Sequence, residues 1–576
     1  MNHNQGVPSP GRYAVGSSGF SGDWNSNAHG SAKWMLPEEA AQLDFFSYYP
    51  GSIILGQSSQ GRLACFNRQG HVLVIAPPRS GKGVGFVQAN LFGYQGSMVV
   101  TDPKGENAAV SHRFRRTTLG QNVVILDPTK KLASYGVQPS IATHRFNPLA
   151  VFQNSNYVEV VDDIERIADA LLVAKEGEKE QHWRDGARSY LKSMLTYLVF
   201  FMPPEKHNLI VLSRLANGLE APTEDIFLAL VHNPHPDPIM QDIIARSGAW
   251  WSIVNPKERA SFVSFALRSL SWLNSPVWHE QLTGSDFHPY DLKAGKTTVY
   301  IVCPFEKLED YSPWFRLVLS SCIIAVLRAP NRSTIPTLFM LDEYAATIGR
   351  LAALEHSIPY MEGVGGRYAM VFQDLGQMTE LWPNNKHHSI FSSAGAHVFF
   401  NVGDDFTSDY VSKYMGKYGA MAPAQGGMTF VSRDLLTPDE VRRHPETDMI
   451  AFVRGFRPAW LGKLDIRKHR EFTGRHDPNP AYFVLPDKPK PALPAGAASM
   501  PMLSAASALA KAKGVSKLPD LTVNSVAAAI NAKYPDKNMR AEDGLYGYDD
   551  VWTNPATGQR ETFFVGLIHL DLLNAL

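Results

Sequence analysis

Apolar residues in this chain fall into short unbroken runs rather than into alternating patterns. Such runs are typical of strands in a parallel sheet, where helices cover both faces and every side chain is buried. Helical stretches separate the runs, which predicts an α/β fold with a parallel-rich sheet. The expected strands are residues 72–76, 97–101, 123–126, 298–302, 337–341, 368–372, 397–400 and 450–453.

Between residues 158 and 290 the strand pattern gives way to helical periodicity. Apolar residues recur at intervals of three and four from Val160 to Leu172 and again from Trp183 to Leu198, so each stretch predicts an amphipathic helix. The sequence therefore predicts an all-α domain over residues 158–290. This domain would be inserted into a core formed by residues 31–157 and 291–484.

Both ends of the chain differ in composition from this core. Residues 1–30 are rich in Gly, Ser and Asn and predict a flexible segment, because they contain little that can be buried. Residues 485–514 are rich in Pro, Ala, Ser and Lys, as in an extended linker. Aromatic residues then return, so we expect residues 515–576 to form a small separate module.

The overall composition describes a globular protein without a strong net charge. The 576 residues include 55 basic and 55 acidic side chains, so any nucleic-acid-binding surface would have to be local. The three cysteines have no CxxC spacing, which argues against a disulfide framework or a zinc site. No apolar window reaches the roughly 20 residues of a membrane helix, and no signal peptide is visible. These features predict a cytoplasmic location and no transmembrane helix in this chain.

The first candidate for chemistry is a glycine-lysine loop that follows the apolar run 72–76. Backbone N–H groups in such a loop bind polyphosphate, and Lys82 would reach the β- and γ-phosphates. The loop departs from the usual G-x-x-x-x-G-K-[ST] pattern at Ala76 and at Gly83, and the second change removes a hydroxyl ligand for Mg²⁺. The residues expected to bind ATP are Pro78, Arg79, Ser80, Gly81, Lys82, Gly83 and Val84.

An acidic pair, Asp342 and Glu343, follows the apolar run 337–341. At the carboxyl end of a parallel strand this is the Walker B arrangement, in which Asp342 would hold Mg²⁺ and Glu343 would polarise the attacking water. An apolar strand with an acidic end is by itself a weak signal, because many such ends are only solvated. Together with the preceding phosphate loop, the pair predicts a RecA-like P-loop NTPase.

Further polar positions lie at expected strand ends or in nearby loops. Gln373, after the run 368–372, is placed to sense the γ-phosphate, or else it is a strand-end glutamine that faces solvent. Arg367 and Arg350 are candidates for a catalytic arginine that acts on the nucleotide of a neighbouring subunit. The segment 102–106 closes a strand at the same edge, where it either contacts nucleotide or a neighbouring subunit or forms a turn.

Taken in order along the chain, these segments resemble the type IV secretion coupling proteins, the TraG/TraD-like family of conjugation ATPases. The resemblance covers about residues 30–475, and this family tolerates glycine after the phosphate-loop lysine. The matching segments are 30–34 (GSAKW), 51–56 (GSIILG), 76–85 (APPRSGKGVG), 102–107 (DPKGEN), 341–344 (LDEY), 365–367 (GGR), 373–374 (QD) and 435–440 (LLTPDE).

The resemblance implies an ATP- and Mg²⁺-dependent motor whose inserted all-α domain helps to recognise substrate. It also implies a hexameric ring with ATP between subunits, and delivery of relaxase–DNA or effector protein to a channel in the inner membrane. Members of this family usually begin with transmembrane helices, and this chain begins where those would end. We therefore expect a peripheral position at the inner face of the bacterial inner membrane.

Two other functions are compatible with the sequence. The first is a soluble adaptor that binds secreted proteins and uses nucleotide only to set its oligomeric state, which the neutral overall charge favours. The second is a general DNA pump for chromosome segregation, which would share the motor core. The sequence shows no C-terminal winged-helix module of the kind expected in such a pump. On the leading hypothesis the cargo is DNA, protein or both.

Overall fold

The computed structural model describes residues 29–135, 143–153, 157–172, 181–384, 386–424 and 427–480, together with three strands near the end of the chain. The chain divides into two compact units, Met1–Tyr482 and Phe483–Leu576. The predicted flexible segment 1–30, apart from its last two residues, and the predicted linker 485–514 lie outside the described residues. The domain boundaries predicted within the larger unit stay predictions.

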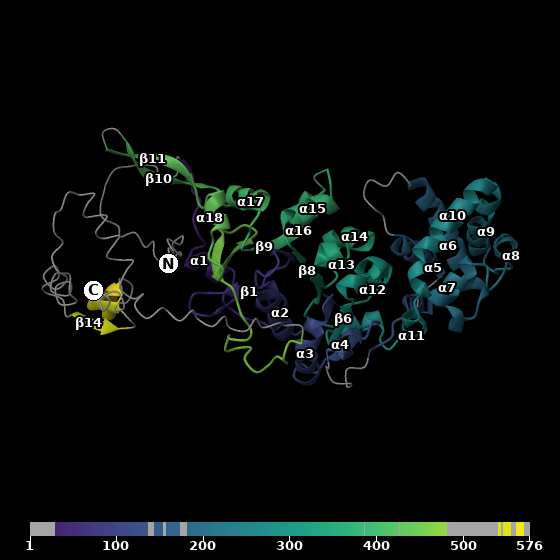
Figure 1. Ribbon diagram of the computed structural model, residues 1–576, viewed down its shortest axis with the longest axis horizontal. Helices are drawn as coiled ribbons and strands as arrows, with labels where there is room; N and C mark the ends of the chain where they lie inside the picture. The colour runs from purple at the N-terminus through teal and green to yellow at the C-terminus, as the bar shows by residue number, and fades with distance from the viewer. Residues whose placement is uncertain are drawn as a thin grey trace, which may run out of the picture. The chain divides into compact units, whose positions relative to one another are not determined.

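An eleven-stranded sheet with the order β2-β1-β13-β12-β9-β3-β8-β7-β4-β6-β5 forms the centre of the larger unit (Figure 1). From β9 to β5 in this order, neighbouring strands are parallel. These strands are β3 (His71–Ile75), β4 (Met98–Asp102), β5 (Asn122–Leu126), β6 (Thr297–Val302), β7 (Thr337–Leu341), β8 (Gly366–Phe372) and β9 (Ala394–Phe400).

Every predicted strand is present, with ends that differ by a few residues, which confirms the parallel-rich α/β sheet. The last predicted strand, β12 (Asp448–Val453), pairs antiparallel with β9. Three further strands, which the pattern does not predict, extend this edge of the sheet: β1 (Ile53–Gln57), β2 (Leu63–Phe66) and β13 (Ala459–Gly462). They have only four or five residues each, and apolar runs this short do not by themselves distinguish a strand from other structure.

Helices cover both faces of the sheet, as continuous burial of the strands requires. Along β3 the side chains alternate between two hydrophobic clusters: Leu73 and Ile75 belong to one cluster, and Val72 and Val74 to the other. The first cluster includes residues of α12 (Leu308–Arg328) and α14 (Ala352–Met361), and the second includes residues of α2 (Gln88–Gly93) and α3 (Glu106–Thr117).

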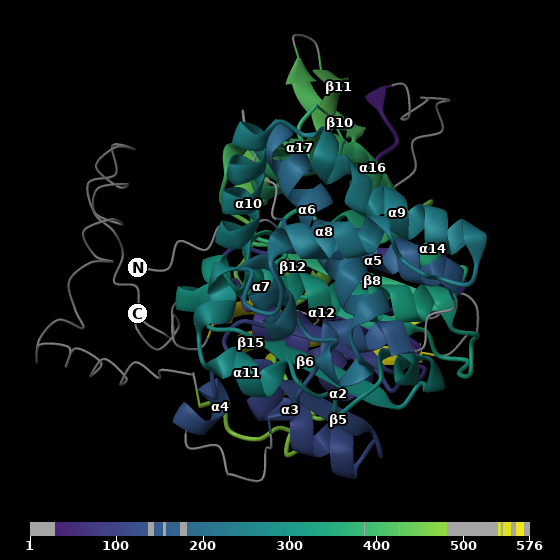
Figure 2. The same cartoon turned by 90° about the vertical axis from the view of Figure 1, so that its right-hand side faces the viewer.

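The described residues between 157 and 294 form helices and no strand, as their periodicity predicts. The helix α5 (Tyr157–Leu171) packs against α12 of the core, and α6 (Gln181–Phe201) packs against α5 and α10. Figure 1 shows α6 to α10 grouped beyond the sheet, and Figure 2 turns this group toward the viewer. The other helices are α7 (Leu209–Ala216), α8 (Thr223–Val231), α9 (Pro238–Ile253), α10 (Pro256–Ser269) and α11 (Val277–Gln281).

Two smaller β-structures lie outside the main sheet, and the sequence pattern predicts neither. In the larger unit, β10 (Lys417–Ala424) and β11 (Gly427–Asp434) form a hairpin whose base is joined to the N-terminal segment by the bond from Ala32 N–H to Lys417 O, 2.9 Å long. In the smaller unit, β14 (Met539–Glu542), β15 (Leu545–Thr553) and β16 (Arg560–His569) form a three-stranded antiparallel sheet within the predicted module 515–576.

One helix, which runs from Phe305 to Arg328, could cross a membrane by length and composition alone. This helix has 24 residues, and the mean hydropathy over its best window is 1.2. Within the fold, 72% of that window is buried. Its side chains pack against the sheet, α5 and α14, which is the usual environment of a core helix.

Arg115 in α3 is a buried cation whose hydrogen bonds connect α3 to three neighbouring segments of the chain. Its Nη1 donates to Leu91 O (2.6 Å) and Tyr94 O (3.0 Å), its Nη2 to Gly96 O (2.9 Å) and its Nε to Thr298 Oγ1 (2.7 Å). Burial lowers the pKa of Arg115 to about 10, so the guanidinium is still charged at neutral pH. The bonds join α3 to α2, to the connection between α2 and β4, and to β6.

We expect Arg115→Met to lower the free energy of unfolding by about 3 kcal/mol, because buried carbonyl groups lose their donors. Urea unfolding followed by tryptophan fluorescence measures the loss. Arg246→Met in α9 is the matched control, since that side chain is 73% exposed, and we expect a change below about 0.5 kcal/mol. Equal losses in the two variants would show that the buried hydrogen bonds contribute little.

Candidate active site

Five neighbouring parallel strands end at one edge of the sheet, and most of the predicted site residues lie there. Parallel pairing causes this convergence, because the carboxyl ends of parallel strands meet at a common edge, where α/β proteins bind ligands. Lys82 and Glu343 are 261 residues apart in sequence and are in contact here. In the order β9, β3, β8, β7 and β4, the strand ends are followed or occupied by Asn401, the loop 76–83, Gln373, the pair 342–343 and Asp102.

Lys82, Glu343 and Gln373 form one connected group at this edge. Lys82 Nζ forms an ion pair with Glu343 Oε1 at 2.6 Å, and both side chains are 11% exposed. The second carboxylate oxygen of Glu343 accepts a hydrogen bond from Gln373 Nε2 at 3.0 Å. Burial raises the pKa of Glu343, but Lys82 and Gln373 stabilise the carboxylate and hold the pKa below its usual value. Glu343 is therefore ionised at neutral pH.

Asp342 lies buried beside this group. Its Oδ1 accepts the N–H of Glu343 at 3.0 Å, and its backbone carbonyl accepts the hydroxyl of Thr101 at 2.8 Å. Burial raises the pKa of Asp342 to about 6, although the charge of Lys82 opposes this. The described residues contain no cluster of three or more metal-ligating side chains. Mg²⁺ commonly binds one or two carboxylates together with phosphate oxygens and water, so Asp342 fits a Mg²⁺ that arrives with a nucleotide.

The loop 76–83 has a backbone and free space that fit polyphosphate. Arg79 (φ 62°) and Gly81 (φ 90°) adopt left-handed conformations, which turn successive N–H groups to one side. A Cβ atom at Gly81 or Gly83 would meet no atom within 4 Å. Ser80 Oγ is buried and has no hydrogen-bond partner among the described residues. Open space next to an unused buried hydroxyl is what a phosphate chain would fill.

Lys463 supports the loop from the antiparallel side of the sheet, and sequence reasoning misses it. Its Nζ donates to Ser80 O at 2.7 Å and also to Asn401 Oδ1, and it lies 5.4 Å from the centre of the Phe400 ring. Burial lowers the pKa of Lys463 to about 8. The residue follows β13, which the apolar pattern does not predict, and no motif marks it.

Backbone strain is concentrated at the same edge. Six described non-glycine residues have a positive φ, and three of them, Arg79, Glu343 (φ 51°) and Asn401 (φ 24°), belong to this site. Such conformations cost about 1–3 kcal/mol each and persist where the surrounding structure enforces them, often at functional sites. The strain therefore supports a functional role for this edge independently of the sequence motifs.

The segment 102–106 forms a turn, which agrees with one of the two interpretations of its sequence. Asp102 accepts the N–H groups of Asn107 (3.3 Å) and Ala108 (2.8 Å), so it caps the start of α3. Gly105 provides the left-handed residue of the turn, with φ 72°. Burial raises the pKa of Asp102 to about 8. A contact of this segment with nucleotide or with a neighbouring subunit stays a prediction.

Arg367 lies at the start of β8, at the opposite end of that strand from Gln373. Its side chain is buried and its guanidinium lies 5.2 Å from the centre of the Phe66 ring. This geometry corrects the prediction of Arg367 as a catalytic arginine, because the guanidinium is already committed to backbone groups at the wrong edge of the sheet. It donates to three carbonyls, those of Gly51 (3.3 Å), Arg68 (2.9 Å) and Gly70 (3.2 Å).

Comparison with known proteins connects this geometry to a family. Residues 32–476 match the family model described as type IV secretory system conjugative DNA transfer. Protein VirD4 of Rhizobium radiobacter is 26% identical over 503 residues, which cover 80% of this chain and 68% of VirD4. Conjugal transfer protein TraG of Escherichia coli is 26% identical over 504 residues, which cover 77% of each chain.

Solved structures of a plasmid coupling protein share the fold. TrwB in complex with ADP and Mg²⁺ has a TM-score of 0.51 and 15% sequence identity, over 71% of this chain and 89% of TrwB. The unbound monoclinic form of TrwBdeltaN70 has a TM-score of 0.50 and 16% identity, with the same coverage. These similarities confirm the predicted fold class.

The close approach of the segment after the phosphate loop to the backbone at Leu464 can be tested by substitution of Gly85. A Cβ atom at Gly85 would lie 2.7 Å from Leu464 O, a backbone atom that cannot move freely, whereas Gly83 has open space. We expect Gly85→Ala to destabilise the protein by roughly 1–3 kcal/mol through overpacking, and Gly83→Ala to leave stability unchanged or slightly raised. Thermal unfolding by scanning fluorimetry measures both variants. A Gly85→Ala protein as stable as Gly83→Ala would contradict the close approach.

Proposed function

The chain belongs to the type IV secretory system conjugative DNA transfer family, and we propose that it hydrolyses ATP to drive substrates toward a secretion channel. The observation that supports this most directly is the contact of Lys82, Glu343 and Gln373 beside the phosphate loop. An ionised carboxylate, an amine and an amide at the carboxyl edge of a parallel sheet are the groups that nucleotide hydrolysis requires.

In the proposed reaction the loop binds the phosphates of ATP and Lys82 exchanges Glu343 for the γ-phosphate. This exchange frees the Glu343 carboxylate to orient water and to accept its proton. The lowered pKa of Glu343 keeps it in the ionised form that a base requires. Gln373 donates a hydrogen bond to Glu343, which would hold the carboxylate in place, and Gln373 would also contact the γ-phosphate. Asp342 would hold Mg²⁺, which would supply positive charge to the phosphates.

Lys82→Ala removes the one side-chain cation of the loop that lies against Glu343. We expect ATP turnover to fall at least about 100-fold and nucleotide affinity to fall as well, because the phosphates lose their principal charge partner. Phosphate release in the presence of single- and double-stranded DNA measures turnover, and titration with a fluorescent ATP analogue measures affinity. The control is Lys206→Ala in the helical region, whose side chain is 49% exposed; wild-type turnover in Lys82→Ala would rule out the assignment.

Glu343→Gln preserves the size of the side chain but removes its ability to accept a proton. We expect turnover to fall by a factor of about 10² to 10⁴, as for loss of a general base, while nucleotide affinity stays within a few-fold of wild type. The same two assays separate these effects. A variant that hydrolyses ATP normally, or one that has lost nucleotide binding to the same extent as Lys82→Ala, would contradict the proposed role of Glu343.

We further propose that the active form is a homo-oligomeric ring, a hexamer by analogy with the family, with ATP bound between subunits. It would act at the inner face of the bacterial inner membrane, where it receives relaxase–DNA or effector protein and passes them to channel components. The family match and the name of the TraG relative, which refers to conjugal transfer, support this proposal. They favour it over a soluble adaptor without DNA transport and over a chromosome-segregation pump.

A further inference from the structure

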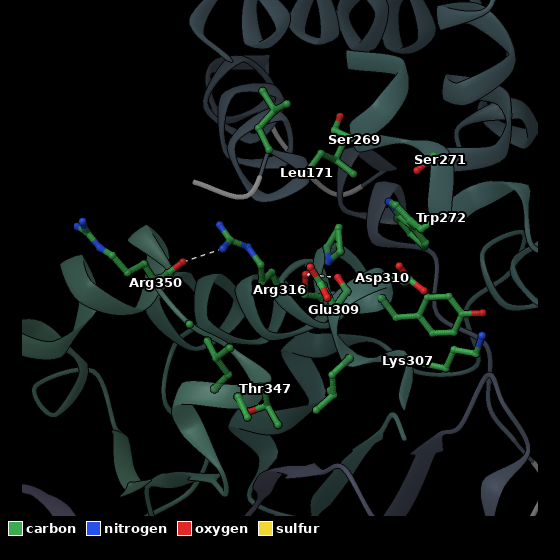
Figure 3. A pocket seen from close by; sticks show the side chains of 18 of the residues that line it. Leu171, Ser269, Ser271, Trp272, Lys307, Glu309, Asp310, Arg316, Thr347 and Arg350 are labelled. Atoms are coloured by element: carbon green, nitrogen blue, oxygen red, sulfur yellow. Dashed lines mark hydrogen bonds between the residues drawn. The ribbon is translucent and has the colours of Figure 1, made fainter. Parts of the chain in front are cut away.

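A cleft of about 1430 Å³ lies between the helical region and the core (Figure 3). Its core wall consists of the first part of α12 and residues 345–350, and its other wall comes from the ends of α5 and α10 and the start of α6. None of the nucleotide-site residues Lys82, Asp342, Glu343 and Gln373 lines it. The cleft is therefore a second cavity with its own set of side chains.

Arg316 projects from α12 into this cleft and is only 7% exposed. Its Nη1 donates to Arg350 O at 2.8 Å, but its Nε has no hydrogen-bond partner, and none of the described carboxylates forms an ion pair with it. Burial lowers the pKa of Arg316 to about 10, so the group remains a cation at neutral pH. Glu355 and Asp169 act on this charge without forming an ion pair with it, and a buried guanidinium without a hydrogen-bonded anion is costly unless a ligand supplies one.

A second unused donor lines the opposite wall of the cleft. Trp272, which follows α10, is 7% exposed, and its indole Nε1 is buried without an acceptor among the described residues. A buried donor left unpaired is costly, and most buried donors in proteins have partners. Arginine and tryptophan side chains donate hydrogen bonds and do not accept them. Arg316 Nε and Trp272 Nε1 therefore have no acceptor among the described residues, and a ligand with an anionic oxygen would provide one.

We propose that this cleft binds a peptide segment of a protein partner through a carboxylate that accepts hydrogen bonds from Arg316. The guanidinium geometry suits a planar carboxylate, and the apolar rings of Phe265 and Trp272 in the lining suit the neighbouring side chains of a peptide. The cleft would recognise an acidic side chain, or a C-terminal carboxylate, that is flanked by apolar residues of the partner.

The charges of the lining favour a peptide over nucleic acid. Basic side chains in the cleft are accompanied by Glu309, Asp310 and Glu380. A polynucleotide gains affinity from many phosphate contacts to basic groups, and these carboxylates would repel its backbone. A peptide with a single carboxylate needs only one cation and tolerates acidic neighbours at a distance.

The cleft is joined to the nucleotide site through the chain itself. Residues 345–350 line the cleft and directly follow Asp342 and Glu343, and the carbonyl of Arg350 accepts the bond from Arg316. A carboxylate that draws the guanidinium toward itself would alter this bond and the segment behind the Walker B pair. An effect on ATP turnover rests on the proposed function, whereas the binding itself does not.

The test measures fluorescence anisotropy of labelled short peptides in which one glutamate is flanked by Leu, Ala and Phe, and of the same peptides with glutamine. We expect the full chain to bind the glutamate peptides about tenfold more tightly, as for a charge-assisted bidentate contact. Arg316→Gln should abolish this difference, and Arg316→Lys should retain part of it. The control Arg246→Gln, an exposed arginine in α9, should keep the full difference.

Thermal unfolding of the same variants distinguishes a binding residue from a structural one. Because Arg316→Gln removes an uncompensated buried charge, it should melt no lower than wild type in the absence of peptide. A clear loss of stability without peptide would indicate a purely structural role and overturn the proposal. All binding is measured without ATP, so failure of the proposed ATPase would not affect the result.

Three binding results would also overturn the proposal. The first is equal affinity of wild type for glutamate and glutamine peptides. The second is binding of an oligothymidylate that depends on Arg316 while peptide binding does not, which would assign the cleft to nucleic acid. The third is tighter peptide binding after Glu176, Glu178 and Glu180 are changed to glutamine, because the chain's own carboxylates would then be the occupants.

Discussion

Parallel pairing of β9, β3, β8, β7 and β4 is the constraint on which the rest of the site depends. Each strand is buried on both faces, so its register is fixed by packing on two sides, and a slip of one residue would exchange the two hydrophobic cores. The same register determines which polar residue is placed at which point of the carboxyl edge. The separation of Lys82 from Glu343 along the chain therefore has no bearing on the precision of their contact. Packing of the hydrophobic interior thus fixes the positions of the polar side chains at the carboxyl edge.

The Lys82–Glu343 ion pair gives this edge a balanced charge. Lysine and glutamate are both mostly buried, and each compensates the desolvation of the other. Asp342 adds a further carboxylate, whose pKa is raised first by burial and then by the neighbouring charge of Glu343. In the proposed reaction, a cation that accompanies the nucleotide would compensate the charge of these carboxylates, and the phosphates would attract Lys82 away from Glu343. The charge compensation on nucleotide binding and the release of the Glu343 carboxylate from Lys82 would therefore occur in the same step.

Sequence-based prediction succeeds where local burial determines the pattern, and it fails where the partners of a residue are distant along the chain. β7 was predictable because all its positions are buried, so its apolar run is unbroken. Arg367 was misassigned because its flanking glycines suggest a loop, whereas β8 begins at Gly366 and makes it a strand residue at the far edge. Lys463 contacts Ser80 and Asn401, which are 383 and 62 residues away along the chain. No local pattern encodes such contacts, nor the unpaired donors of Arg316 and Trp272, because only the folded chain brings their surroundings together.

The bond from Lys463 to Ser80 changes where the minimal nucleotide-binding fragment of this protein ends. Judged by motifs alone, a fragment that stops after Gln373 would contain everything needed to hold a nucleotide. The phosphate loop, however, is supported by Lys463, which follows Gln373 by ninety residues in the sequence. Between them the chain forms β12, antiparallel to β9, and then β13, antiparallel to β12. Natural truncation, proteolysis or gene fusion between Gln373 and residue 463 would leave the phosphate loop and the Walker B pair intact but would remove the support of the loop. The antiparallel edge is thus part of the nucleotide-binding unit rather than an appendage to it.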